Sequence, residues 1–112
     1  MLQRIQRIAD HLKKVTGGFV PETGIILGTG LSGLGKEIQV EHAIAYGDIP
    51  EFPVSTVQGH PGKLLFGKLG GKPVVAMQGR FHYYEGWTMG EVVMPVRVMK
   101  FLGIERLFVS NA

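Results

Sequence analysis

The segment GIILGTGLSG, residues 24–33, joins a short apolar run to a loop rich in glycine. The apolar part, residues 24–27, has no polar face, which is typical of a strand buried on both sides within a parallel or mixed sheet. Glycines that follow such a strand let backbone N–H groups approach an anion closely, and Thr29 adds a hydroxyl donor at the same place. The segment therefore predicts a sheet strand followed by an anion-binding loop.

Two nucleotide-binding patterns overlap this loop, and each lacks one part. Residues Gly28 to Gly33 match G-x-G-x-x-G, but the acidic residue that a dinucleotide site needs at the end of the next strand is represented only by Asp48, in a predicted loop. Residues Gly30 to Lys36 match most of the P-loop pattern, but Glu37 stands where a hydroxyl should hold magnesium. A loop for a small anion is favoured, and a tight turn without a ligand is the structural alternative.

The rest of the chain alternates between predicted helices and strands. Apolar residues at 2, 5, 8, 12 and 15 predict an amphipathic helix that ends at Gly17 and Gly18, with Arg4, Arg7 and Lys14 on its solvent face. Further strands are predicted at residues 38–46, 63–69, 72–77 and 106–110, and Gly70-Gly71 predicts a tight hairpin turn.

A second helix is predicted to begin near a capping box formed by Thr88 and Glu91 and to end at Gly103. Pro95 lies inside it, so either the first turn begins later than the box indicates or the helix is kinked. The elements together predict an α/β fold with a mixed β-sheet flanked by helices. Residues 1–112 are expected to belong to one domain without an internal boundary.

Composition excludes several classes of protein. The 112 residues contain 17 glycines and no cysteine, and the net charge of +3 is too small and too dispersed for a nucleic-acid-binding surface. The amino-terminal residues lack the continuous apolar stretch of a signal peptide or a membrane span. Four histidines without the spacing of metal ligands predict no metal site. We expect a soluble protein.

The segment QGRFHYYEGW, residues 78–87, concentrates polar and aromatic side chains. If it is extended, Arg80, His82 and Tyr84 share one face. They would offer hydrogen-bond donors to a phosphate and a flat aromatic surface to a sugar. A purely structural role for these side chains remains equally open. His60, in a loop of glycine and proline, is a weaker candidate for the same site.

Several further segments stand in a fixed order along the chain. They are Gly28-Thr29-Gly30-Leu31, Gly33-Leu34, Tyr46-Gly47-Asp48-Ile49-Pro50, Phe52-Pro53, Ser55-Thr56-Val57, Gly59-His60, Gly62, Gln78-Gly79-Arg80-Phe81-His82, Tyr84-Glu85-Gly86, Pro95-Val96-Arg97-Val98 and Asn111-Ala112. Together these segments resemble the amino-terminal part of the trimeric purine nucleoside phosphorylases. Related methylthioadenosine phosphorylases share the glycine loop but differ over residues 80–86.

The resemblance implies phosphorolysis of purine (deoxy)ribonucleosides to the free base and (deoxy)ribose 1-phosphate, with inorganic phosphate as co-substrate and no metal or organic cofactor. It implies a homotrimer in the cytoplasm, with no nucleic-acid or membrane partner. By position, the phosphate ligands would be Thr29, Arg80, His82, the backbone N–H of Ala112 and, less directly, His60; His82 would also be catalytic, and Tyr84 would contact the ribose. Thr29 stands where the family more often has serine, and it keeps the hydroxyl.

The family's purine-binding residues lie beyond the position that corresponds to Ala112. The fold is therefore expected to be incomplete at its carboxyl end, and the isolated chain is expected to be inactive. Its last strand should expose an unpaired edge and an apolar face, which favours association. The alternatives are a non-catalytic nucleotide-binding module built on the Gly28–Gly33 loop and an enzyme similar to methylthioadenosine phosphorylase.

Overall fold

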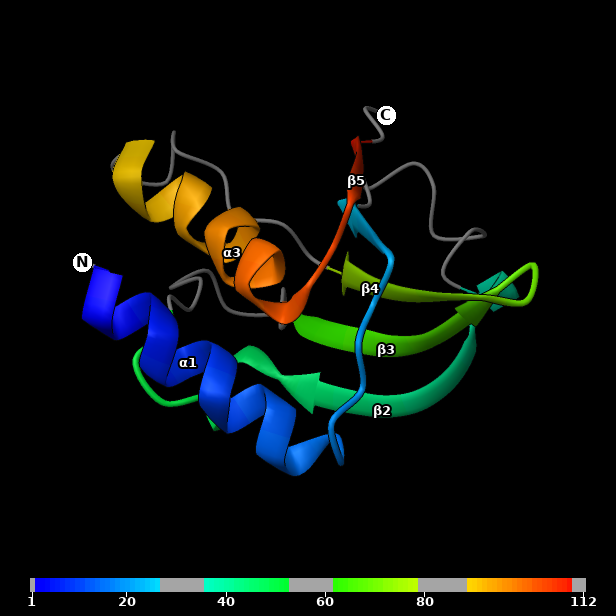
Figure 1. Cartoon of the computed structure of the whole chain (residues 1–112), viewed down its shortest axis with the longest axis horizontal. Helices are drawn as coiled ribbons and strands as arrows, with labels where there is room; N and C mark the ends of the chain where they lie inside the picture. The colour runs from blue at the N-terminus through cyan, green and yellow to red at the C-terminus, as the bar shows by residue number, and fades with distance from the viewer. Residues whose placement is uncertain (1, 27–35, 53–61, 79–88, 110–112) are drawn as a thin grey trace.

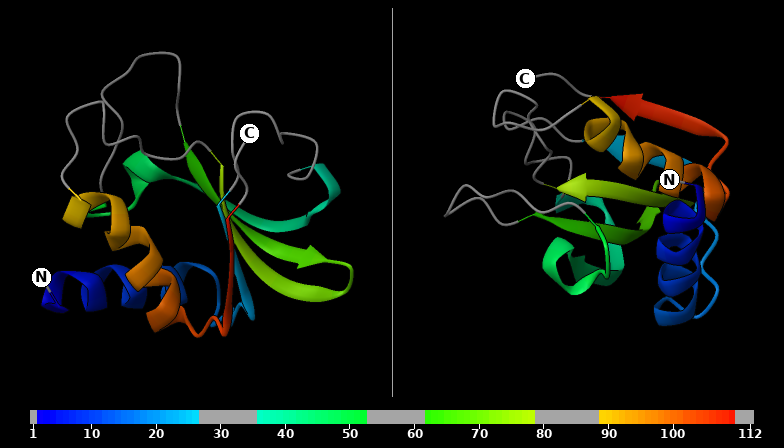
Figure 2. Two further views of the ribbon diagram at one scale, coloured as in Figure 1. Left: turned by 90° about the horizontal axis from the view of Figure 1, so that it is seen from above. Right: turned by 90° about the vertical axis from the view of Figure 1, so that its left-hand side faces the viewer.

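The computed structural model describes residues 2–26, 36–52, 62–78 and 89–109. These residues form one sheet with two long helices against the same face (Figures 1 and 2). The elements, in chain order, are α1 (Leu2–Val15), β1 (Thr23–Ile26), β2 (Gln39–Ala45), the 3-10 turn η2 (Tyr46–Asp48), β3 (Lys63–Leu69), β4 (Lys72–Gln78), α3 (Met89–Leu102) and β5 (Arg106–Val109). The predicted α/β class with a mixed sheet is confirmed.

The five described strands lie in the order β2-β3-β4-β1-β5. Strand β1 is parallel to both β4 and β5, whereas β3 is antiparallel to both β2 and β4. Ile26 at the end of β1 is level with Met77 of β4 and with Val109 of β5. The carboxyl ends of three neighbouring strands therefore lie side by side at one edge of the sheet.

Helix α1 forms as its periodicity predicts, with Ile5, Ile8, Ala9 and Leu12 buried. The predicted apolar stripe is too long at both ends, since Leu2 is 63% exposed and Val15 is 45% exposed. The Thr16 hydroxyl donates to the Leu12 carbonyl oxygen at 2.7 Å, and the two glycines that follow adopt positive φ angles. Helix α1 thus ends as expected, because glycine adopts the left-handed conformation of a helix terminus without strain.

The predicted hairpin of β3 and β4 is confirmed, with Leu69 paired to Lys72 across the turn. Gly70 has φ of 60° and Gly71 has φ of 82°. Two consecutive residues with positive φ are what a type I′ turn requires, and its twist matches that of the strands it joins.

Replacing Gly71 by alanine is expected to lower the free energy of unfolding by about 1 to 2 kcal/mol, because a Cβ disfavours left-handed backbone. A Cβ at this position would meet no neighbouring atom within 4 Å, so a packing clash would not contribute. Urea unfolding of the variant and of the parent protein measures the difference. Equal midpoints would contradict the turn type.

Helix α3 runs from Met89 to Leu102 with Pro95 inside it. The alternative in which the helix begins later than the capping box is therefore wrong, while Thr88 itself lies outside the described residues. Pro95 is buried against the core, and the helix closes at Gly103, whose N–H donates to the Met99 carbonyl oxygen at 3.2 Å. The predicted end of this helix is confirmed.

The main core lies between the two helices and one face of the sheet. Its largest buried side chains come from α1, α3, β3 and η2, and the ring of Phe66 meets that of Phe19 edge to face at 5.8 Å. Strand β5 is different: Leu107 is 42% exposed and Phe108 is 55% exposed, and among the described strands β5 pairs with β1 alone. The expected exposure of the last strand is thus confirmed, although Ser110 lies outside the described residues.

Candidate functional site

The carboxyl ends of β4, β1 and β5 are the start points of three segments that carry predicted site residues. Segment 27–35 follows β1 and contains Thr29, segment 79–88 follows β4, and segment 110–112 follows β5. Because the three strands are parallel and adjacent, these segments leave the sheet next to one another. Ligands of open α/β sheets bind outside the carboxyl ends of the strands, so this edge is the candidate site.

The first residue of β3 lies at the same edge of the sheet, and β3 follows a fourth segment of the chain, residues 53–61. Strand β3 is antiparallel to β4, and its first residue, Lys63, pairs with the last residue of β4, Gln78. The segment that contains His60 therefore joins the sheet beside the end of β4.

The six predicted site residues themselves lie outside the described residues. Thr29 and Ala112 each stand three positions beyond a described strand end, and Arg80 stands two positions beyond one. The structure brings together the strand ends that precede these residues, and their contacts stay a prediction. The remaining members of the predicted set are His60, His82 and Tyr84.

The turn that precedes segment 53–61 is held by two arginines of α1. Arg7 Nε and Nη2 donate to the two carboxylate oxygens of Glu51 at 2.7 Å each. Arg4 donates to the Glu51 carbonyl oxygen through Nε at 2.9 Å and also through Nη2. We call these three residues the Arg–Glu clamp. The hydrogen bond from Arg7 lowers the pKa of the Glu51 carboxyl.

The clamp is not predicted by the sequence, whose pattern places Arg4 and Arg7 on a solvent face of α1. Arg7 is indeed exposed, but both guanidinium groups donate hydrogen bonds to Glu51. Glu51 lies 44 positions after Arg7 and 47 positions after Arg4. Their spacing of three residues places both arginines on one side of the helix, and this spacing is the signal in the sequence for a shared partner. Nothing local in the sequence identifies their partner.

Tyr46 joins the residues that flank segment 53–61. Its ring contacts that of Phe52 with centroids 5.2 Å apart, and its N–H donates to the Gly62 carbonyl oxygen at 3.0 Å. Its side chain is buried, and burial raises the pKa of its hydroxyl. The two described ends of the segment that carries His60 are thus attached to the same buried residue.

At the amino ends of the parallel strands, Glu22 makes contacts with residues next to or within the neighbouring strands. Its N–H donates to the Pro73 carbonyl oxygen at 2.9 Å, and its carbonyl oxygen accepts from the N–H of Glu105 at 2.8 Å. Its carboxylate lies 3.7 Å from Lys72 Nζ and 3.6 Å from Arg106 Nη1. These contacts join the starts of β4, β1 and β5, and no predicted site residue belongs to this end.

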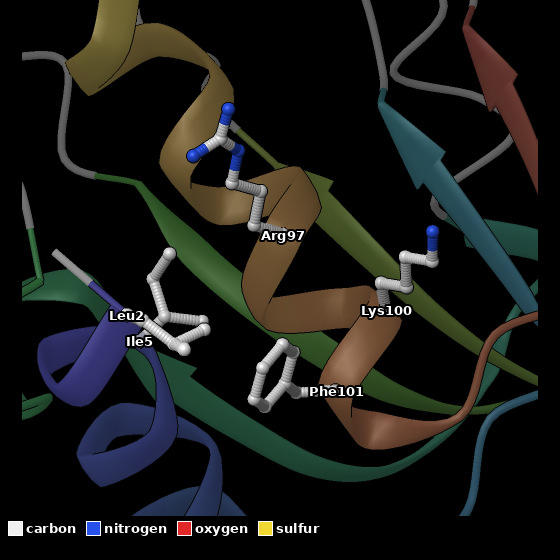
Figure 3. Close-up of a pocket in the computed structure, with 5 residues that line it drawn as sticks. All are labelled: Leu2, Ile5, Arg97, Lys100 and Phe101. Carbon is white, nitrogen blue, oxygen red and sulfur yellow. The ribbon is translucent and has the colours of Figure 1, made fainter.

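A groove of about 390 Å³ lies between the first turns of α1 and the second half of α3 (Figure 3). Its lining combines apolar side chains with two cations, namely Leu2, Ile5, Arg97, Lys100 and Phe101. None of these residues was predicted to bind a ligand.

The described ranges contain neither a cluster of metal-binding side chains nor a helix that could span a membrane. No group of three or more histidine and carboxylate side chains there could hold a metal ion. No helix in those ranges is long and apolar enough to cross a membrane.

The strand order separates this fold from the dinucleotide-binding fold. There the second strand lies beside the first, whereas here β3 and β4 stand between β1 and β2. Asp48 lies in the turn η2 and not at the end of a strand. The arrangement of the described strands gives no support to the dinucleotide reading of residues 28–33.

Comparison with known proteins decides the family. A family model described as the phosphorylase superfamily matches residues 22–112. The chain belongs to the phosphorylase superfamily. It is 54% identical to purine nucleoside phosphorylase 1 of Bacillus subtilis (strain 168) over 112 residues, which are all of this chain and 41% of that relative.

Solved structures of superfamily members share the fold. A purine nucleoside phosphorylase in complex with ribose 1-phosphate is similar with a TM-score of 0.92 and 49% identity, over 99% of this chain and 40% of that one. The Schistosoma mansoni purine nucleoside phosphorylase in complex with inosine is similar with a TM-score of 0.89 and 47% identity, over 98% of this chain and 38% of that one. The chain thus spans about 40% of the length of these proteins, and its fold is nucleoside-phosphorylase-like.

Proposed function

We propose that the complete protein that carries this chain is a purine nucleoside phosphorylase. Inorganic phosphate attacks the anomeric carbon of a purine (deoxy)ribonucleoside, the bond from that carbon to the base nitrogen breaks, and the products are the free base and (deoxy)ribose 1-phosphate. The observation that carries this proposal is the adjacency of the carboxyl ends of β4, β1 and β5, from which the segments with the predicted phosphate ligands depart. The relatives named purine nucleoside phosphorylase support the same reaction.

The proposed roles follow from the chemistry of the side chains. Thr29 donates a hydroxyl, Arg80 donates from a planar fork that matches phosphate oxygens, and the N–H of Ala112 adds a backbone donor. His82 is the proposed catalytic residue, which holds phosphate as it attacks, and His60 supports the same anion. Tyr84 is proposed to contact the ribose.

The protein's contribution to the rate is positioning and electrostatics. As the glycosidic bond lengthens, positive charge builds on the sugar, and a phosphate held against it stabilises that charge while supplying the nucleophile. A site that fixes the phosphate in this orientation needs no covalent intermediate on the protein.

The test is phosphate-dependent release of hypoxanthine from inosine by the complete protein, with ribose 1-phosphate measured as the second product. Release of the base without phosphate would contradict the proposal, since it would indicate hydrolysis. Faster cleavage of methylthioadenosine than of inosine would favour the alternative, an enzyme similar to methylthioadenosine phosphorylase. Binding of a dinucleotide without any cleavage would favour a non-catalytic module.

We also propose that the reaction uses no metal or organic cofactor. The complete protein is proposed to form a homotrimer and to be located in the cytoplasm. Activity is expected to survive dialysis against a chelator, and sedimentation is expected to give three times the mass of the complete chain. The isolated 112-residue chain is expected to show no turnover of inosine, because the family's purine-binding residues lie beyond it. Robust turnover by the isolated chain would contradict this last expectation.

A further inference from the structure

The two outer strands of the described sheet, β2 and β5, differ in character. Strand β2 has the features of a natural edge: its register with β3 shifts between Val40 and His42, and Glu41 between them is exposed. Bulges and charged side chains of this kind protect an edge from pairing with another strand. Strand β5 pairs with β1 in register over all four of its residues, and two of these, Leu107 and Phe108, are exposed apolar side chains.

The exposed apolar residues of β5 lie on opposite faces of the sheet, because side chains alternate along a strand. Leu107 lines a groove with Val96 and Ile104 of the segment that contains α3, on the face that the helices cover. Phe108 is level with Ile25 of β1 and lies on the other face. A strand with apolar side chains on both faces is typical of the interior of a parallel sheet, where further layers cover both faces. The composition of β5 is therefore that of an interior strand.

A groove of about 280 Å³ lies beside Phe108 on the face opposite the helices, and we call it the Phe108 groove. Ile25 and Val74 in its lining belong to a core cluster that includes no residue of α1 or α3, and each is 3% exposed. Phe108 itself is 55% exposed. The lining consists mainly of apolar side chains from β1, β4, β5 and the end of β3, namely Thr23, Ile25, Leu69, Lys72, Val74 and Phe108.

The chemistry of the Phe108 groove and the length of the relatives indicate what covers it. Lys72 is the one charged residue in the described lining, and its Nζ already lies 3.7 Å from the Glu22 carboxylate, so the groove offers little to a charged partner. The chain spans 41% of one relative and 40% of a similar solved structure. Since β5 is the last described strand, polypeptide that follows it in a protein of that length begins at this edge of the sheet. A segment of the same chain also has a high effective concentration at the groove.

We propose that the part of the complete protein that follows residue 112 packs an apolar segment into the Phe108 groove. This inference rests on the proposed function, because the relatives with the additional length are purine nucleoside phosphorylases. Phe108 is then a buried side chain of the complete protein, and β5 is an interior strand. The two parts share one hydrophobic core, and they are not separate domains joined by a linker.

Hydroxyl-radical labelling of the complete protein, measured for each residue by mass spectrometry, tests the proposal without any substitution. Phe108 should be labelled more slowly than Phe101, although Phe108 is 55% exposed and Phe101 is 40% exposed in the structure. Labelling of Phe108 at the rate of Phe101 or faster would overturn the proposal. The labelling is repeated on samples diluted until sedimentation gives the mass of a single chain. Phe108 should remain protected there, and protection that disappears with the oligomer would overturn the proposal, since the occupant would be a second copy.

Urea unfolding of variants of the complete protein provides an independent measurement. Phe108→Ala should lower the free energy of unfolding at least about threefold more than Phe101→Ala, because truncation of a buried aromatic side chain costs far more than truncation at an exposed position. Phe108→Leu keeps most of the buried volume, so it should fall between the parent and Phe108→Ala and serves as the test if the alanine variant does not fold. Equal effects of Phe108→Ala and Phe101→Ala, or a Phe108→Leu variant as stable as the parent, would contradict burial of Phe108.

Failure of the proposed function has a different signature from failure of this inference. If the function is wrong, the parent protein releases no base from inosine in the presence of phosphate. The labelling and unfolding measurements do not depend on turnover, so they still decide whether the Phe108 groove is covered by the same chain.

Discussion

Replacing Arg80 by alanine in the complete protein is expected to lower kcat/KM for phosphate by about 10- to 100-fold, the range expected when a hydrogen-bonded partner of a charged group is removed. Arg80 stands two positions beyond the end of β4, and β4 lies beside β1, which leads to Thr29. A guanidinium group there would give phosphate two parallel donors and a full positive charge, and alanine gives neither. The measurement is the dependence of the initial rate on phosphate concentration at saturating inosine.

Two controls make the Arg80 result specific. Arg97→Ala removes the same side chain from an exposed position on α3, and it should leave phosphate use unchanged. Arg80→Lys keeps the charge and loses the planar fork, so it should fall between the parent and Arg80→Ala. If Arg80→Ala and Arg97→Ala show the same saturation curve for phosphate as the parent, Arg80 is not a phosphate ligand.

Replacing Phe66 by alanine is expected to lower the free energy of unfolding by about 3 to 5 kcal/mol, the usual cost of truncating a buried aromatic side chain. Phe66 lies in the middle of β3, is 0% exposed and meets the ring of Phe19 edge to face. The substitution removes the buried apolar area and leaves a cavity in the main core, which rigid neighbours fill only in part. Urea unfolding followed by circular dichroism measures the change.

Phe101 provides the matched control for Phe66. It is 40% exposed at the end of α3, so its truncation should change the free energy of unfolding far less. Phe66→Leu retains most of the buried volume and should cost less than half of what Phe66→Ala costs. Equal unfolding midpoints for Phe66→Ala and Phe101→Ala would show that the core is not packed around Phe66.

The elements predicted most accurately are those that local rules determine. Helix α1 follows from the spacing of Ile5, Ile8 and Leu12 together with the two glycines that end it. The turn between β3 and β4 follows from Gly70 and Gly71, since only glycine enters positive φ without strain. Pro95 illustrates the limit of such rules, because its unfavourable effect on a helix is overridden by burial of α3 against the core.

The candidate site was predictable only as a set of residue types. The glycine loop, Arg80 and His82 have the chemistry of an anion-binding site, and they belong to the segments that resemble a known family. The matches to superfamily members support that family assignment. The Arg–Glu clamp could not be found in this way. Its partners are more than 40 positions apart, and a salt bridge between distant residues leaves no periodic or local pattern in a sequence.

The helices, the strands, the hairpin and the family can be predicted from the amino-acid sequence, because each depends on neighbouring residues or on motifs in a fixed order. The position of β1 between β4 and β5, and the contacts of Arg4 and Arg7 with Glu51, emerge only in the folded chain. This difference arises because strand order depends on which apolar faces can be buried together once the intervening chain is closed. That choice involves the whole molecule, and it is what brings the ends of three strands, and the segments that follow them, to one edge of the sheet.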